Sequence, residues 1–273
     1  MEQLITIKPK KGLAALDFKE IWQYKGLFYF FSWRDLKVRY KQTIIGVLWA
    51  VFQPFITMVV FSVFFGGLAK MPSDGIPYPI FVYIGLLFWQ FFSTSLSQAS
   101  NSLINNKEII TKVYFPRLIL PISSIITNFI DFLIAFVILV GLMFYYHYSP
   151  NLISLLILPL LLLITFVVAI GLGLLLAAIN VKYRDVRYVL PFFIQIMLFI
   201  TPVIYPISIL QNYSWLMAIN PMTGIINAAR NAFLGTAPVD WLLLLISAAI
   251  GLFLFVLGLI YFKKIEKSFA DIV

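Results

Sequence analysis

The sequence has 273 residues, of which 62% are hydrophobic and 11% are charged, and its formal net charge is +9. One soluble core cannot hide that much apolar surface, so the composition excludes an ordinary soluble protein and predicts an integral membrane protein. Because the chain has no cysteine, disulfides, thiolate catalysis and cysteine-ligated metals are excluded as well.

The first 42 residues form a polar, basic N-terminal region, which we expect to be cytoplasmic and without a removable signal peptide. Residues 12–31 gather apolar side chains on one helical side and polar ones opposite, which predicts an amphipathic helix lying in the membrane interface. A cytosolic helix packed on the next loop is the alternative. The apolar side consists of Ala14, Phe18, Ile21, Trp22, Phe28 and Tyr29.

Six apolar stretches are long enough, or nearly so, to cross hydrocarbon about 30 Å thick, which takes roughly 20 helical residues. They are residues 43–69, 79–101, 118–145, 152–180, 189–206 and 239–262. The fifth is the shortest, and Pro202 and Pro206 predict a break at its outer end. We therefore expect an all-α fold with a six-span transmembrane domain at 43–262 and a cytoplasmic tail at 263–273.

Lysine and arginine are distributed unevenly along the chain. Nine precede residue 43, and three lie in each of the 102–117 loop, the 181–188 loop and the tail, which leaves Lys70 and Arg230 for the other loops. The positive-inside rule then places both termini in the cytoplasm. The positive charge is accounted for by membrane orientation, so nucleic acid is not an expected partner.

Two polar or punctuated segments connect the spans. The 102–117 loop is too polar to enter lipid, and it predicts a short helix capped at Asn105 or Asn106. In residues 207–238, Asn220 and Pro221 predict a helix start and Gly235 its end. A helix of roughly 14 residues is too short to cross, so we expect short re-entrant helices on the outer side.

The sequence lacks the usual signals of a catalytic site. The single histidine, His147, is predicted at the outer surface, and no GxxxxGK[ST] loop is present, so any ATP-driven function needs another subunit. Asp131 lies near the middle of the third span, where an acid is costly. It is either a functional acid or a structural one that is hydrogen-bonded to the polar residues preceding it, which are Ser123, Ser124, Thr127 and Asn128.

Two helical faces combine side-chain amides with aromatic rings. The first-span face consists of Gly46, Trp49, Gln53, Thr57 and Phe64, and the fifth-span face of Phe192, Gln195 and Phe199. The amides either join helices by hydrogen bonds or form a pore wall in which rings stack on sugars and amides meet hydroxyls. Six spans are few for a wide polar duct, so we expect a homodimer with the duct at the subunit interface.

Four stretches, in order along the chain, resemble one known family. They are RDLKVRYKQTIIGVLWAVFQP from Arg34, KVYFPR from Lys112, NVKYRDVRYVLPF from Asn180, and TPVIYP from Thr201 followed by NPM at Asn220. Together they resemble the membrane subunit of ABC-2 type exporters, specifically the polysaccharide and polyol phosphate export permeases of bacterial envelopes. The resemblance covers essentially the whole chain.

The resemblance implies a homodimeric permease in the bacterial cytoplasmic (inner) membrane, with two separate ATPase subunits that carry ATP and magnesium. This chain would then bind no cofactor, and its cargo would be a lipid-linked polysaccharide such as O-antigen, teichoic acid or capsule. Spans one and five would line the channel. The loop after span two would contact the ATPase through Asn105, Asn106, Lys107, Glu108, Lys112, Tyr114, Phe115 and Pro116, and the outer gate would include Tyr205, Pro206, Asn220, Pro221 and Arg230.

Several alternatives remain at this stage. Basic residues before the first span are either contacts for a lipid pyrophosphate or anchors that follow the positive-inside rule. They are Arg34, Lys37, Arg39 and Lys41. The cargo could instead be a drug or small lipid. An intramembrane enzyme acting on lipid-linked sugars lacks the clustered carboxylates it needs, and a passive channel gives the long docking loop no role.

Overall fold

The structure is a computed structural model, and it describes residues 18–41, 44–149, 152–183, 185–209, 214–235, 237–266 and 269. Every regular element in these ranges is helical, which confirms the predicted all-α class. The helices are α1 (Phe18–Gln23), α2 (Lys25–Tyr40), α3 (Ile44–Phe61), the π-helix η2 (Ser62–Leu68), α4 (Tyr78–Asn105), α5 (Lys107–Lys112), α6 (Ile119–Tyr145), α7 (Leu152–Lys182), α8 (Val186–Ile200), α9 (Ser214–Ala218), α10 (Pro221–Leu234) and α11 (Trp241–Ile265).

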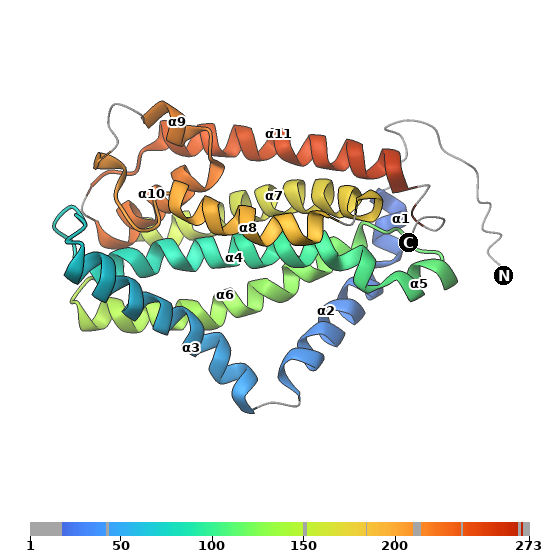
Figure 1. The fold of residues 1–273 in the computed structure, drawn as a ribbon, viewed down its shortest axis with the longest axis horizontal. Helices are drawn as coiled ribbons and strands as arrows, with labels where there is room; N and C mark the ends of the chain where they lie inside the picture. Colours follow the sequence, from blue (N-terminus) through green and yellow to red (C-terminus); the bar gives the residue numbers. More distant parts are fainter. Residues whose placement is uncertain are drawn as a thin grey trace.

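Five helical segments of the described residues are long and apolar enough to cross a membrane. They match predicted spans one, two, three, four and six, and they are Val51–Leu68, Tyr78–Asn105, Ile119–Tyr145, Ser154–Lys182 and Trp241–Ile265. Four of the long helices, α4, α6, α7 and α11, run along the long axis of the molecule (Figure 1). The short helices gather at the ends of this bundle, with α5 at one end and α9 and α10 at the other (Figure 1).

The fifth predicted span is a shorter helix than the others. Helix α8 covers 15 residues, Val186–Ile200, and is apolar, yet it falls below the length that qualifies the other five. It ends before Thr201, whose backbone is extended (ψ 139°), because the residue before a proline is pushed out of the helical region. The predicted break at the outer end of this span is therefore confirmed.

Helix α10 follows from local signals alone. It covers 14 residues, the Asn220 side chain accepts a hydrogen bond from the backbone N–H of Met222 (3.0 Å), and Pro221 occupies the first turn. Gly235 closes it in the left-handed conformation (φ 62°), which glycine adopts without steric cost. Both predicted ends are confirmed, whereas the predicted re-entrant depth of this segment stays a prediction.

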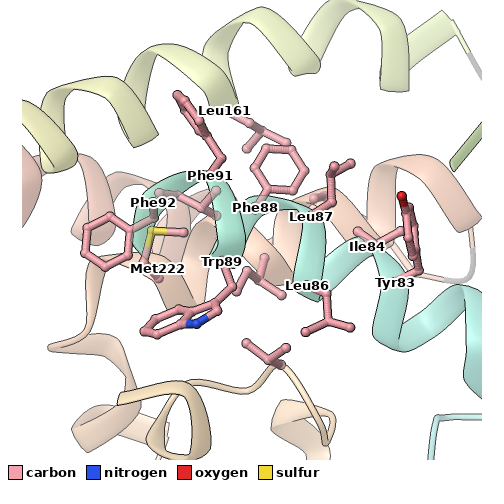
Figure 2. Close-up of a cluster of buried hydrophobic side chains, with 14 of the residues drawn as sticks. Tyr83, Ile84, Leu86, Leu87, Phe88, Trp89, Phe91, Phe92, Leu161 and Met222 are labelled. Atoms are coloured by element: carbon pink, nitrogen blue, oxygen red, sulfur yellow. The ribbon is translucent and has the colours of Figure 1, made fainter. Parts of the chain in front are cut away.

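Helix α4 forms the centre of the bundle. It packs against α6, α7 and α10, and its apolar side chains between Tyr83 and Phe92 share one buried cluster with Leu161 of α7 and Met222 of α10 (Figure 2). The Tyr83 hydroxyl donates a hydrogen bond to the backbone carbonyl of Ala135 on α6 (2.8 Å), so this buried polar group is satisfied. A helix buried on nearly all sides provides a fixed frame for the helices around it.

Helices α7 and α11 approach closely through glycine. A Cβ atom built on Gly258 of α11 would lie 2.0 Å from the carbonyl oxygen of Gly171 on α7, a separation that no side chain tolerates. Lipid tails are as apolar as leucine, so helices in a membrane associate through this close backbone packing rather than through the hydrophobic effect. The pair joins the last span to the centre of the bundle.

The N-terminal helical region consists of two helices rather than one. A break at Tyr24 separates α1 from α2, and α2 continues through the basic residues to Tyr40. Trp22 and Tyr29 are exposed, while Phe31 is buried and packs against Phe115 of the 102–117 loop, with ring centroids 5.7 Å apart. This contact is the packing that the alternative interpretation expects. An interface position for the exposed rings stays a prediction, and Ala14 lies outside the described residues.

Candidate functional site

A polar cavity of about 450 Å³ lies between α2, α3, α4 and α6. Its lining combines eight polar or charged side chains from these four helices with aromatic rings. The volume falls within the range of about 300–1,000 Å³ that is common for small-molecule sites. The lining residues are Arg39, Tyr40, Trp49, Gln53, Pro54, Leu87, Gln90, Phe91, Thr94, Gln98, Asn128, Asp131, Phe132 and Ala135.

Asp131 faces this cavity and pairs with the end of α2. Its carboxylate accepts hydrogen bonds from the Arg39 guanidinium and from the Tyr40 hydroxyl. The Asn128 amide oxygen also accepts from Arg39 (3.3 Å). Burial, followed by the hydrogen bond to Asp131, raises the pKa of Tyr40 to about 12, so this phenol stays a donor at neutral pH. Asp131 is thus a paired acid, and its cation comes from a different helix.

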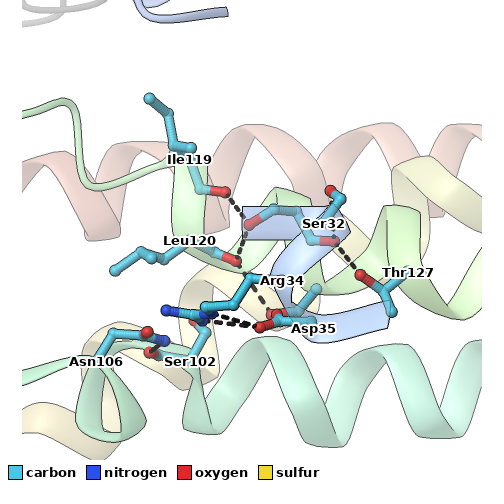
Figure 3. Close-up of polar contacts among 10 residues, drawn as sticks. Ser32, Arg34, Asp35, Ser102, Asn106, Ile119, Leu120 and Thr127 are labelled. Atoms are coloured by element: carbon cyan, nitrogen blue, oxygen red, sulfur yellow. Dashed lines mark hydrogen bonds and ion pairs between the residues drawn. The ribbon is translucent and has the colours of Figure 1, made fainter. Parts of the chain in front are cut away.

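The polar residues that precede Asp131 on α6 do not hold it. The hydroxyls of Ser123, Ser124 and Thr127 donate to backbone carbonyls one turn back on their own helix, at 2.7–3.1 Å. Figure 3 shows the hydrogen bond of Thr127 and the backbone carbonyls of Ile119 and Leu120, which accept from the Ser123 hydroxyl. The predicted structural partners are therefore wrong for these three residues, because hydroxyls in a helix reach their own i−4 carbonyl more easily than a side chain one turn ahead.

The other basic residues of α2 have neighbours of their own. Arg34 pairs with Asp35 at 2.8 Å (Figure 3), and the Lys37 ammonium lies 5.8 Å from the Trp33 ring centroid. Lys41 is exposed. Of the four residues predicted to contact a lipid head group, Arg39 is thus the one that turns into the polar cavity.

The two predicted channel faces are largely exposed on this chain. On α3, Trp49, Gln53 and Phe64 are exposed, and the half-buried Thr57 hydroxyl donates to the backbone carbonyl of Gln53 (2.8 Å). Gly46 lies in the first turn of the same helix. On α8, Phe192, Gln195 and Phe199 are all exposed, with 65% of Phe192 accessible. Helices α3 and α8 each pack against α4, so both faces are presented by the same central frame.

Three polar residues of α4 that line the cavity were not predicted from the sequence. Gln90, Thr94 and Gln98 follow the spacing i, i+4 and i+8 on α4, so they form one polar stripe along the helix. That spacing was a readable signal. Their half-buried side chains all line the cavity, whereas most of the rest of the helix is buried in the core.

The predicted coupling loop combines an exposed surface with a buried anchor. Asn106 is the residue before α5, yet its side chain donates to the Ser102 carbonyl (2.8 Å, Figure 3) and does not cap the helix. The predicted helix and its start after Asn106 are confirmed, but the Asn106 side chain makes no capping hydrogen bond. Phe115 and Pro116 are buried. The exposed members of the set are Asn105, Lys107, Glu108, Lys112 and Tyr114.

The predicted outer gate is built around a buried arginine. The Arg230 guanidinium donates to the carbonyls of Pro202 and Val203 (2.6 Å each) and Phe81 (3.1 Å), and it stacks on the Phe81 ring at 3.6 Å. Burial lowers its pKa to about 9, which leaves it charged at neutral pH. The cation therefore joins α10, α4 and the segment after α8 through backbone carbonyl oxygens and the Phe81 ring.

The remaining gate residues complete the same junction. The Asn220 amide donates to the Thr201 hydroxyl (2.7 Å), and the Tyr205 hydroxyl donates to the Ile200 carbonyl (2.8 Å). Pro206 and Pro221 are buried. Among the described residues, no group of three or more histidine or acidic side chains gathers as a metal site would require.

The comparisons with known proteins agree with this architecture. A family model described as ABC-2 type transporter matches residues 26–234, which is more than half of the chain. The O-antigen export system permease protein RfbA of Myxococcus xanthus is 30% identical over 93% of this chain and 97% of its own length. A protein of the same name from Klebsiella pneumoniae is 30% identical over 88% and 92%, respectively.

A more distant relative extends the set. The polysialic acid transport protein KpsM of Escherichia coli is 22% identical over 73% of this chain and 78% of its own length. The family match spans α2 to α10 and so includes the polar cavity, the 102–117 loop and the Arg230 junction. On these grounds, the chain belongs to the ABC-2 type transporter family.

Proposed function

We propose that this chain is the membrane-spanning permease subunit of an ATP-driven exporter that moves a lipid-linked polysaccharide, such as O-antigen, out of the bacterial cytoplasm. Relatives named as O-antigen export permeases that align along nearly the whole chain support the cargo class. The single structural observation that carries the proposal is the pair of exposed faces, rich in rings and amides, on α3 and α8. Lipid tails offer no hydrogen-bond partner to exposed amides, whereas the hydroxyl groups of a polysaccharide do.

A homodimer of two six-span halves would give these faces a duct to line. In this arrangement α8 is the fifth span, shortened because the segment after it folds back to the Arg230 junction. Two copies placed about a twofold axis would bring the α3 face of one subunit toward the α8 face of its partner. The basic loops and both termini would then lie in the cytoplasm, which agrees with the distribution of lysine and arginine.

Two separate ATPase subunits would drive the cycle from the cytoplasmic end. The 102–117 loop offers them an exposed surface, and its C-terminal end is tied to two other helices. Phe115 packs on Phe31 of α2, and Arg117 bonds to Glu266 at the end of α11. A push on the exposed part would therefore move α2 and α11 together, because both helices are linked to the same short segment.

The polymer itself would slide along weak, repeated contacts. Aromatic rings present flat apolar surfaces to sugar faces, and amides exchange hydrogen bonds with successive hydroxyls. Lys37 and Lys41, near the start of the first span, would attract the anionic head group of the carrier lipid. The Arg230 junction, at the other end of the bundle, would hold the outer exit until the polymer arrives.

A matched pair of substitutions tests the duct. Phe192 on α8 and Phe253 on α11 are equally exposed, at 65% and 64%, but only Phe192 lies on the proposed wall. We expect Phe192→Ala to lower surface polysaccharide severalfold and Phe253→Ala to leave it unchanged, with both proteins at normal abundance. Equal export by the two variants would sink the lining assignment.

The motor is tested by purification. The chain should copurify with an ATPase whose hydrolysis rate changes when the chain is present in lipid vesicles. If no ATPase associates with the chain in its source cell, the exporter proposal is wrong. Catalytic turnover of a lipid-linked glycan by the purified chain alone would point instead to an intramembrane enzyme.

A further inference from the structure

The polar cavity contains hydrogen-bonding groups that the described protein does not satisfy. The side-chain amides of Gln53, Gln90 and Gln98 make no hydrogen bond to any described residue, although each lines the cavity. Within a membrane, an unsatisfied amide is costly and needs water or a ligand as its partner. Three such amides around one cavity form a site that is ready to exchange hydrogen bonds with a guest.

The donors and acceptors of this lining suit hydroxyl groups. Each amide offers a carbonyl acceptor and two N–H donors, and a sugar hydroxyl is both a donor and an acceptor. The Thr94 hydroxyl, between Gln90 and Gln98 on the same stripe, donates to the backbone carbonyl of Gln90 (2.6 Å) and keeps acceptor capacity. The half-exposed ring of Trp49 adds an apolar face beside these groups.

The charges of the cavity favour a neutral guest. Arg39 and Asp131, the charged members of the lining, are bonded to each other, so the lining carries no net charge. A phosphate would meet the Asp131 carboxylate next to a guanidinium that is already paired. A neutral sugar meets no such repulsion, and it can still bond to the remaining lone pairs of the carboxylate.

We propose that the polar cavity between α2, α3, α4 and α6 is a binding site for a neutral sugar residue of the exported glycan, held by Gln53, Gln90, Thr94 and Gln98. This inference rests on the proposed function and adds to it a site at which the polymer is held during transport. Gln53 and Trp49 belong both to the cavity and to the proposed duct wall, so the cavity opens beside the path of the polymer. A residue held there would keep the polymer from sliding back between two ATPase strokes.

The absence of cysteine from the chain makes the site testable. In Thr94→Cys and Phe192→Cys, the introduced thiol is the chain's only one, so a small maleimide reports the accessibility of the cavity or of the duct. The full complex, with its ATPase arrested before hydrolysis, is labelled in membranes from cells that make the glycan and from cells that cannot. We expect the glycan to slow labelling about fivefold at both positions, as a largely occupied site requires.

The two positions separate the two proposals. Protection at position 192 without protection at 94 would overturn the sugar site and leave the exporter proposal standing. No protection at either position would overturn both. A change of conformation could also slow labelling at position 94. Protection by a bound sugar is distinguished from it because it must depend on the amides of the cavity.

A second variant addresses that point. Adding Gln98→Leu to Thr94→Cys removes one amide and keeps an apolar side chain in the span, so we expect protection at 94 to fall at least about threefold, as the loss of one or two net hydrogen bonds predicts. Gln23→Leu, on the exposed surface of α1, is the matched control and should leave protection intact. Full protection in the Gln98→Leu background would overturn the site.

Discussion

Gly85 on α4 gives Arg230 the space it occupies: a Cβ atom built on Gly85 would lie 2.7 Å from Nη2 of Arg230. The same Cβ would lie 3.1 Å from the Val203 carbonyl oxygen, which accepts a hydrogen bond from that nitrogen. The guanidinium cannot simply swing away, because its other donors are held by Pro202 and Phe81. The absence of a side chain at Gly85 thus allows α4, α10 and the segment after α8 to meet.

Gly85→Ala should therefore loosen the junction at the outer end. We expect a loss of about 1–3 kcal/mol, typical of an overpacked core, and a lower midpoint of thermal unfolding in detergent. Gly141→Ala is the matched control, since nothing lies within 4 Å of its Cβ position on α6. That substitution should be neutral or stabilise the helix by up to about 1 kcal/mol. Equal midpoints for the two variants would contradict the close fit.

The contact between α7 and α11 should respond in a graded way. Gly258→Ala places a methyl group 2.0 Å from the backbone oxygen of Gly171, whereas Gly251→Ala meets only the side-chain end of Val168 at 2.7 Å. A backbone atom in a packed helix cannot move aside, but a side chain can. We expect Gly258→Ala to abolish folded protein in size-exclusion chromatography and Gly251→Ala to cost about 1–3 kcal/mol. The reverse order would show that this contact does not hold the two helices together.

The sequence predicted local features of the fold with small errors. Helix α10 begins and ends where Asn220, Pro221 and Gly235 indicate, because caps act on the residues beside them. Apolar runs likewise placed α4, α6, α7 and α11 within a few residues, since lipid sets their length. Such signals need no knowledge of the neighbouring helices.

Features that depend on distant residues were missed. Asp131 pairs with Arg39, which is 92 residues away in the sequence. The spacing of polar and apolar residues within either helix does not predict that contact. The amphipathic pattern of 12–31 did not predict the break at Tyr24, nor the contact of Phe31 with Phe115, which is distant in the sequence. The role of the α3 and α8 faces as walls of a transport channel stays a prediction.

In the 102–117 loop, we expect one residue to stabilise the fold and its neighbour to contact the ATPase. Phe115 is 3% exposed and Tyr114 is 64% exposed, although they are neighbours. Phe115→Ala should cost about 3–5 kcal/mol of stability because a buried ring is lost. Tyr114→Ala should change stability by about 0.5 kcal/mol or less and still reduce the stimulation of the partner ATPase. Thermal unfolding and ATPase assays on the two purified variants measure these effects, and an unstable but normally coupled Tyr114→Ala would reverse the assignment.

The pair of Arg39 and Asp131 should behave as one unit. Arg39→Gln or Asp131→Asn alone leaves a charge without its partner in a partly buried position, and we expect each to cost about 1–3 kcal/mol, less than a fully buried pair because both side chains keep 28–29% exposure. The double variant carries two neutral amides that can bond to each other, so it should recover at least half of that loss. A double-mutant cycle of unfolding midpoints measures the coupling. Strict additivity of the two single effects would mean that the two side chains act independently and that the pair does not fasten α2 to α6.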